Sequence, residues 1–301
     1  MKKLLFSGVL ILSLVLISCS GNNVSEDNTI QNETNNNEPV VSENEPIVSE
    51  EEPAENNTVV KIKDSELEKL IRDEIEKPEG DLLPSDMEKL YRLNINFDET
   101  PVYELDGLEH AINLENFSFR NGTLKSLNPV SDCSDLYYLN MSYSKLEEAV
   151  ELFNTPLLET VSFIDTNVSD FSFLKSSNII GSLNLIRCDI ENIDFLENMN
   201  ELESLGLSEN RISDVSVINN KTELIDLDLG KNQIVDLESL STCNKLVSIN
   251  ISYNNVTSIA PLFDLDNLIE VIVYEDLDQK IIDRAEIQRM LDKGVGVLYH
   301  E

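Results

Sequence analysis

The chain has 301 residues, of which 57 are acidic and 22 basic, and its formal net charge is −35 at pH 7. From residue 58 onward there are 47 acidic and 20 basic residues, an excess that disfavours nucleic acid and bare anionic lipid as ligands of the folded part. A cationic partner, or a neutral one bound through apolar and hydrogen-bonding contacts, fits this charge better.

The N-terminal segment has the organisation of a bacterial lipoprotein signal peptide. Two lysines precede an apolar run from Leu4 to Ile17, which a serine and Cys19 follow directly. The run is about 22 Å long as a helix, which is shorter than the roughly 30 Å hydrocarbon core of a bilayer. The string Leu-Ile-Ser-Cys that ends at Cys19 resembles the lipobox, and this resemblance implies cleavage before Cys19 and acylation of its sulfur. The alternative is a plain secretory signal with an incidental cysteine.

An acidic segment with little apolar content follows the predicted anchor. Residues 20–57 contain ten acidic residues and no lysine or arginine. The string EPVVSE at 38–43 recurs as EPIVSE at 45–50, a low-complexity repeat in which proline interrupts any helix or strand. Because such a segment cannot bury a core, we predict a disordered tether that separates the folded part from a membrane.

A period of 22 residues governs most of the remaining chain. Its units open at Leu114, Leu136, Leu158, Ile180, Leu202, Leu224, Leu246 and Leu268. Further apolar residues follow three and five positions after each opening residue, as in the L-x-x-L-x-L-x-x-N-x-I/L template of leucine-rich repeats. A looser unit that starts at Leu90 makes about nine units in all.

The alternation inside each unit predicts one short strand per repeat. Leu227 and Leu229 point inward, whereas Asp226 and Asp228 point outward. Because no single unit can bury its own apolar residues, the units must stack on one another. The expected fold is a repeat solenoid of the α/β type, a leucine-rich-repeat horseshoe of about nine 22-residue units with a parallel concave sheet.

The position after each strand predicts a ladder that joins neighbouring units. In the later units this position is asparagine, namely Asn210, Asn232 and Asn254. An asparagine amide both donates and accepts hydrogen bonds, which suits a turn with buried backbone groups. Earlier units hold Gly122, Ser144, Thr166 and Cys188 here. We interpret Cys188 as a ladder residue. Cys133 and Cys243 occupy the same position of units five repeats apart, which places them about 24 Å from each other. We therefore expect no disulfide between them.

Both ends of the stack need a cap, because each would otherwise expose an apolar layer. At the front, the strings SELE at 65–68 and SDME at 85–88 match the helical capping box. At the back, a helix is expected from Gln279 to Asp292 and a strand from Val295 to Tyr299. The predicted segments are a lipoprotein signal peptide (1–18), an acidic disordered tether (19–57), a helical N-terminal cap (58–89), leucine-rich repeats (90–275) and a helix-strand C-terminal cap (276–301).

Signatures of catalysis are missing from the sequence. His110 and His300 have no companion at ligand spacing, and there is no H-E-x-x-H, G-x-S-x-G, G-x-x-x-x-G-K or C-x-x-C motif. Asp226 and Asp228 would point the same way from one strand and could hold calcium or act as an acid and a base. Calcium needs about six to eight oxygens from a shaped loop, so a solvated acidic face is the favoured interpretation. We expect no enzyme activity, no cofactor and no metal.

Large side chains at outward positions mark a candidate ligand-binding region on the concave face. They are Arg120, Tyr138, Tyr143, Ile164, Ile186 and Arg187. Exposed apolar clusters often mark interaction sites, in which tyrosine and arginine are favoured anchors. The alternative is that adjacent strands cover the isoleucines. A second group, Tyr253, Ile272 and Tyr274, is explained by packing against the C-terminal strand.

Residues 62–301 resemble the internalin-type leucine-rich-repeat proteins of bacterial surfaces. The resemblance lies in the 22-residue unit, the acidic front helix and the Ser or Asp after the isoleucine, as in Ile212-Ser213-Asp214. It implies an extracytoplasmic adhesin or receptor-like module that binds host or neighbouring-cell proteins on its concave face. We also expect the folded part to be monomeric. We expect two departures from that group: a lipobox in place of a C-terminal wall-sorting signal, and no immunoglobulin-like extension after the repeats. A cell-envelope scaffold or co-receptor acting on the bacterium's own components is the alternative.

Overall fold

The structure is a computed structural model that describes residues 58–151, 154–274 and 282–299. All of them belong to the unit Ala54–Glu301. The expected signal peptide, Cys19 and the tether lie outside the described residues and stay predictions. Among the described residues, no helix combines the length and apolar character needed to cross a bilayer.

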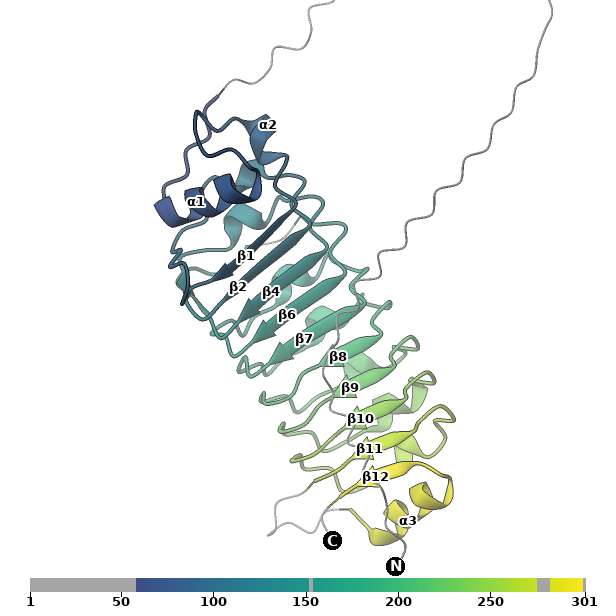
Figure 1. Ribbon diagram of the computed structural model, residues 1–301. Helices are drawn as coiled ribbons and strands as arrows, with labels where there is room; N and C mark the ends of the chain where they lie inside the picture. Colours follow the sequence, from purple (N-terminus) through teal and green to yellow (C-terminus); the bar gives the residue numbers. More distant parts are fainter. Residues whose placement is uncertain (1–57, 152–153, 275–281, 300–301) are drawn as a thin grey trace, which may run out of the picture. The chain divides into compact units, whose positions relative to one another are not determined.

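A single parallel sheet of ten strands runs along this unit, with the strands in chain order (Figure 1). The strands are β1 (Arg92–Asn96), β2 (Asn116–Arg120), β4 (Tyr138–Ser142), β6 (Thr160–Ile164), β7 (Ser182–Ile186), β8 (Ser204–Gly206), β9 (Asp226–Asp228), β10 (Ser248–Asn250), β11 (Glu270–Ile272) and β12 (Gly296–Leu298). A second parallel sheet has two short strands, β3 (Thr123–Leu124) and β5 (Lys145–Leu146), which follow β2 and β4 along the chain.

The strand register follows the 22-residue period. From β2 to β11 each residue pairs with the one that is one repeat further on, as Asn116 does with Tyr138 and Ser248 with Glu270. Strand β1 pairs with β2 through Arg92 and Asn116, so the first unit is two residues longer, as its sequence indicates. The parallel sheet and its register confirm the expected leucine-rich-repeat solenoid.

Alternation along each strand separates the core from an open face. In β9 Leu227 is 3% exposed, whereas Asp226 before it is exposed and Asp228 after it is partly exposed. We count repeat positions from the opening apolar residue, so that Leu227 is at position four. The open face is then made by positions three, five and seven, and the core by positions one, four and six.

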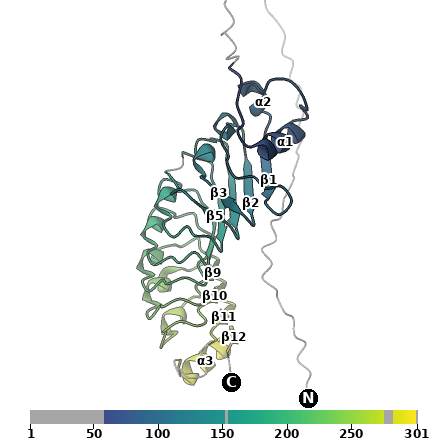
Figure 2. The ribbon, with the colours of Figure 1, turned by 90° about the vertical axis from the view of Figure 1, so that its left-hand side faces the viewer.

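Short 3-10 helices form the side of the stack opposite the sheet, as Figure 2 shows. They are η1 (Leu108–His110), η2 (Asn128–Val130), η3 (Ser172–Leu174), η4 (Asp194–Leu196), η5 (Ser216–Ile218), η6 (Glu238–Thr242) and η7 (Ala260–Leu262). At η3, η5 and η6 an Asp two residues before the helix binds its first amide. Asp214 Oδ1 accepts a 2.8 Å hydrogen bond from the Ser216 amide, and Asp236 does the same for Glu238 at 2.7 Å. Hydrogen bonds from Ser216 also lower the pKa of Asp214.

Two helices lie at the N-terminal end of the sheet, α1 (Ser65–Glu74) and α2 (Pro84–Met87). The capping boxes expected at Ser65 and Ser85 are wrong. Asp64 caps α1, because its Oδ1 accepts from the amides of Glu66 and Leu67 at 3.0 and 3.1 Å. Its Oδ2 accepts from the Tyr103 amide at 2.8 Å, so the cap also ties α1 to the first repeat. At α2, Asp86 accepts from the Leu83 amide.

Helix α3 (Arg284–Asp292) precedes β12 at the other end. Asp283 is its N-cap and accepts from the Ala285 amide at 2.9 Å, so the helix begins later than the expected Gln279, which itself lies outside the described residues. Ile287 and Met290 are buried against the core. This helix therefore covers apolar side chains beyond the last repeat.

Candidate functional site

Buried asparagines join neighbouring repeats where the strands end. Asn210 Nδ2 donates to the carbonyl oxygens of Leu185 and Leu207 at 2.7 and 2.9 Å. Its Oδ1 accepts from the amides of Cys188 and Ile190 at 3.0 and 3.1 Å. One side chain thus satisfies four backbone groups in two repeats, which fixes the turn out of the sheet.

Asn232 and Asn254 repeat three of these four bonds one and two repeats further on, because Nδ2 again binds two carbonyl oxygens and Oδ1 one amide. In an earlier repeat Cys188 takes this place, and its Sγ lies 3.3 Å from the Phe163 carbonyl oxygen. Burial raises the pKa of the Cys188 thiol. A thiol held in this way is a poor nucleophile at neutral pH.

The residue before each ladder position has left-handed backbone geometry, although none of these residues is glycine. We call this set the left-handed row. It consists of Asn121, Tyr143, Asp165, Arg187, Glu209, Lys231 and Tyr253, with φ between 53° and 65°. Each amide of the row donates to a carbonyl oxygen of the next repeat, as Arg187 does to Ser208 at 3.1 Å. The repeated bond holds a conformation that non-glycine residues rarely adopt.

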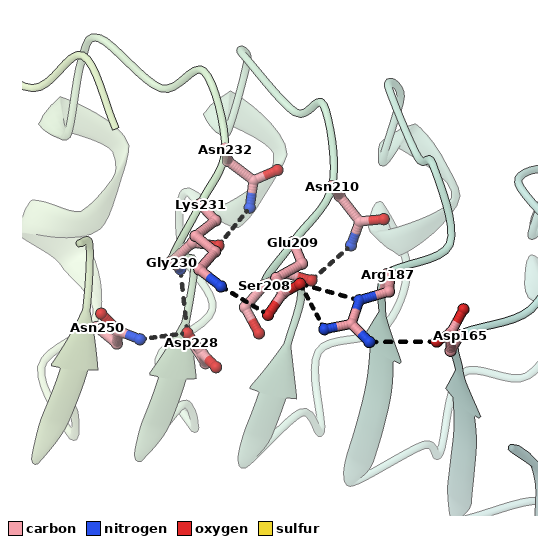
Figure 3. A network of polar contacts seen from close by, with 10 residues as sticks. All are labelled: Asp165, Arg187, Ser208, Glu209, Asn210, Asp228, Gly230, Lys231, Asn232 and Asn250. Atoms are coloured by element: carbon pink, nitrogen blue, oxygen red, sulfur yellow. Dashed lines mark hydrogen bonds and ion pairs between the residues drawn. The ribbon is translucent and has the colours of Figure 1, made fainter. Parts of the chain in front are cut away.

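Four members of the left-handed row form a continuous chain of ion pairs (Figure 3). Arg187 lies between two carboxylates, at 3.2 Å from Asp165 and 2.6 Å from Glu209. Glu209 also accepts from Lys231 Nζ at 3.0 Å. The bonds from Arg187 and Lys231 lower the pKa of Glu209. We did not predict this chain of charges, although its signal was present as alternating signs at a 22-residue spacing.

The structure brings four of the predicted ligand-binding residues together. Strand register places Arg120 beside Ser142, Ser142 beside Ile164, and Ile164 beside Ile186. Tyr143 follows Ser142 directly, and its amide donates to the Ile164 carbonyl oxygen at 2.6 Å. Its side chain is 59% exposed. We call Arg120, Tyr143, Ile164 and Ile186 the isoleucine patch.

The two remaining residues of the prediction stand apart from this patch. Tyr138 lies at the opposite end of β4, four residues before Ser142 and therefore about 13 Å away along the strand. It is half-buried, and burial raises its pKa. Arg187 lies next to the patch in sequence, but its guanidinium binds Asp165 and Glu209. The isoleucines are half-buried, so adjacent strands cover them in part.

One of the two carboxylates of the acidic strand β9 is hydrogen-bonded within the protein. Asp228 accepts from Asn250 Nδ2 at 2.8 Å and from the Gly230 amide at 3.0 Å, whereas burial raises the pKa of Asp226. Within the described ranges, no group of three or more His, Cys, Asp or Glu side chains is arranged to hold a metal ion.

Three residues at position twenty of their repeats, namely Cys133, Lys221 and Cys243, bind a carbonyl oxygen inside the stack. Lys221 Nζ donates to the Leu196 carbonyl oxygen at 2.8 Å and to that of Glu197 at 3.1 Å. The thiols of Cys133 and Cys243 make the equivalent contact with the Leu108 and Ile218 carbonyl oxygens of the preceding repeats. Burial raises the pKa of Cys133 to about 12 and that of Cys243 to about 11. The sequence shows that these residues share one repeat position, but not that their side chains bind backbone carbonyl oxygens.

A stack of parallel strands with a 22-residue register and an asparagine ladder defines a leucine-rich-repeat solenoid. Solved internalin structures from Listeria monocytogenes share this fold. The chain is similar to internalin InlF with a TM-score of 0.69 and 24% identity over 78% of this chain and 68% of that one. For internalin C2 the TM-score is 0.58, with 20% identity over 79% of this chain and 93% of that one.

The functional domain of InlJ, described as including a cysteine ladder, gives a TM-score of 0.51 at 15% identity, over 79% of this chain and 59% of that one. No protein-family model matches the sequence, and no curated protein matches it. The likeness to these internalins is a likeness of fold.

Proposed function

We propose that this protein is a surface-displayed, lipid-anchored module that binds another protein through the open face of its sheet. The isoleucine patch carries this proposal. It places two half-buried isoleucines side by side on neighbouring strands, with the exposed Tyr143 next to Ser142 and Arg120 on the other side of Ser142. The other outward residues of this face are mostly Ser, Asn, Gly or Asp. Aromatic and arginine side chains that surround a small apolar centre are typical of the residues that dominate protein interfaces.

The geometry favours a protein over a small molecule. A sheet face presents a broad surface, and the strands that bear the patch are about 4.8 Å apart. Arg120 to Ile186 therefore extends across three strand spacings, about 14 Å. The negative charge of the folded part disfavours nucleic acid as the partner. We propose that the folded part acts as a monomer.

The test is capture of partners by the full chain and by a variant with Tyr143→Ala and Ile186→Ser. The chain is immobilised and exposed separately to envelope proteins of the producing bacterium and to surface proteins of a host cell. Bound proteins are quantified by mass spectrometry. The variant is expected to lose the partner that the parent captures, while its circular dichroism spectrum and melting temperature stay unchanged.

The matched control is Tyr253→Ala, which removes another exposed tyrosine of the left-handed row. It is expected to keep the partner. Equal capture by the double variant and the parent would move the site away from the isoleucine patch. Capture of envelope proteins alone would assign the protein to the bacterium's own surface.

The proposed anchor is tested at Cys19. We propose acylation of this cysteine after cleavage of residues 1–18, with residues 19–57 as the tether. Cys19→Ala should shift the protein from the membrane fraction to the medium, or leave it unprocessed, as fractionation and mass spectrometry of the N-terminus will show. An unmodified protein that stays membrane-bound in both forms contradicts the anchor.

A further inference from the structure

A row of alternating tyrosines and glutamates lies where the chain enters the first strands of the sheet. These residues are at position two of successive repeats, directly before β1, β2, β4 and β6 (Figure 1). We call Tyr91, Glu115, Tyr137 and Glu159 the tyrosine–glutamate stripe. It lies outside the isoleucine patch, at the other end of the strands.

Backbone hydrogen bonds hold the stripe in register. The Glu115 amide donates to the Tyr91 carbonyl oxygen at 2.8 Å, the Tyr137 amide to that of Glu115 at 3.0 Å, and the Glu159 amide to that of Tyr137 at 3.0 Å. The four residues therefore follow one another at the strand spacing of about 4.8 Å. The two tyrosines are about 10 Å apart, with a carboxylate between them.

The side chains of the stripe are open to solvent. Tyr91 is 53% exposed and Tyr137 is 42% exposed. Both glutamates are exposed, and neither forms an ion pair within the described part of the chain. The Tyr137 hydroxyl accepts from Asn116 Nδ2 at 3.2 Å, which fixes the ring at one end.

The basic residue beside the stripe is already engaged. Arg92 follows Tyr91 and begins β1, but its Nε donates to Glu74 of α1 at 2.8 Å. Among the described residues the two carboxylates of the stripe have no cationic partner. Both tyrosines are exposed, and the faces of aromatic rings attract cations. Together these groups complement positive charge and apolar methylene stems, the combination that lysine and arginine side chains present.

The spacing selects an extended chain over a single small cation. An extended segment places every second side chain on one side, about 6.7 Å apart. The stripe spans about 14 Å from Tyr91 to Glu159, which matches three such side chains. The N-terminal part of this chain is not the complement, because residues 20–57 contain ten acidic residues and no lysine or arginine.

We propose that the tyrosine–glutamate stripe binds an extended, lysine- or arginine-rich segment of a partner protein. The carboxylates of Glu115 and Glu159 pair with the cationic ends. The rings of Tyr91 and Tyr137 receive the stems and the neighbouring cations. The stripe shares no residue with the isoleucine patch. It lies at the N-terminal ends of the first strands, whereas the patch lies at the C-terminal ends of β2, β4, β6 and β7. It therefore adds a second contact surface with its own chemistry.

The test is binding of a fluorescent nonapeptide of alternating lysine and serine to the full chain, measured by fluorescence anisotropy. One variant carries Tyr91→Leu and Tyr137→Leu, which keeps apolar surface but removes the rings. A second carries Glu115→Gln and Glu159→Gln, which keeps shape but removes charge. Each is expected to weaken binding about tenfold, and the same peptide with acetylated lysines is expected not to bind.

The matched controls are Glu203→Gln and Tyr253→Leu, because Tyr253 is exposed and lies outside both the isoleucine patch and the stripe. Glu203 occupies position two of a later repeat, between Gly181 and Ile225, and so has no tyrosine neighbour in the row. Both controls should change affinity less than about twofold. An equal loss with Glu203→Gln would show diffuse attraction to an acidic protein and would overturn the proposal. Unchanged binding of the peptide by the tyrosine variant would also overturn the proposal. The proposal would likewise be wrong if the chain bound spermine but not the peptide, and if the variants weakened that spermine binding.

Discussion

Arg187 binds Glu209 across the boundary between β7 and β8 with two of its nitrogens. Nε lies 2.9 Å and Nη2 2.6 Å from the same carboxylate oxygen. The third nitrogen, Nη1, lies 3.2 Å from Asp165 in the preceding repeat. One side chain therefore connects three repeats along the edge of the open face, where every backbone in the row is left-handed.

Glu209→Gln is expected to lower the free energy of unfolding by about 1 kcal/mol, because it removes the pairs with both Arg187 and Lys231 at a partly exposed site. Urea denaturation at low salt measures this loss, and high salt should reduce it. The control is Asp189→Asn, which breaks a single ion pair with Arg211 at a more exposed site. It should lower the free energy of unfolding by less than Glu209→Gln does. A Glu209→Gln midpoint equal to that of the parent at low salt would contradict the prediction.

Asn232→Ala should be much more damaging than its small change in volume suggests. It removes Nδ2 bonds to the Leu207 and Leu229 carbonyl oxygens and the Oδ1 bond from the Ile212 amide, all buried. We expect a loss of about 2–4 kcal/mol in the free energy of unfolding. The control is Asn267→Ala, which removes one exposed bond to Asn244. Similar melting temperatures for the two variants would show that the ladder is not a main source of stability.

Lys221 should make stability rise with pH in alkaline solution. Burial lowers its pKa, so the unfolded chain binds the proton more tightly than the folded one. The free energy of unfolding then increases as pH rises from the folded pKa towards the unfolded value of about 10.4. In Lys221→Met this contribution disappears, and methionine fits because Met199 occupies the same position one repeat earlier.

The measurement is urea denaturation of parent and Lys221→Met between neutral pH and pH of about 10.5. Lys245→Met is the control, because Lys245 is exposed and its bond to Glu223 raises its pKa, so its contribution to stability should not increase with pH in this range. Parallel stability curves for the parent and Lys221→Met would refute the assignment.

Asp86 should make the N-terminal end sensitive to acid. Burial would raise its pKa, but hydrogen bonds from Lys77, the Leu83 amide and Lys89 outweigh this and lower it from 3.8 to about 2. A depressed pKa stabilises the folded state above pH 3.8, and this contribution is lost as pH falls towards about 2. Asp86→Asn is expected to cost about 2–3 kcal/mol at neutral pH.

Thermal melting from pH 6 to pH of about 2 tests this prediction. The difference between the parent and Asp86→Asn should shrink across the acid range. Asp64→Asn is the comparison variant. It also removes a carboxylate from the N-terminal end of the sheet, but this carboxylate caps helix α1 and pairs with no lysine among the described residues. A difference between the parent and Asp86→Asn that stays constant with pH would show that Asp86 is not the group responsible.

The repeat architecture could be predicted from sequence because its determinants are local and recur. Alternating apolar residues such as Leu227 and Leu229 define one strand, and a constant period leaves the next repeat as its only regular partner. The asparagine at position nine follows from the backbone groups of each turn. The helix starts were less accurate. Asp64 and not Ser65 caps α1, and the same carboxylate binds the Tyr103 amide in the first repeat, a contact that no local sequence motif shows.

Tertiary structure alone decided which side chains meet across repeats. Tyr138 and Tyr143 are close in sequence, but a strand separates them, whereas Arg187 finds partners 22 residues away on either side. Lys221 is charged in the sequence and buried in the stack. Exposure and pairing depend on the neighbouring repeats, because a strand of three to five residues has no interior of its own, and only stacking determines which groups lose water and which remain open to a partner.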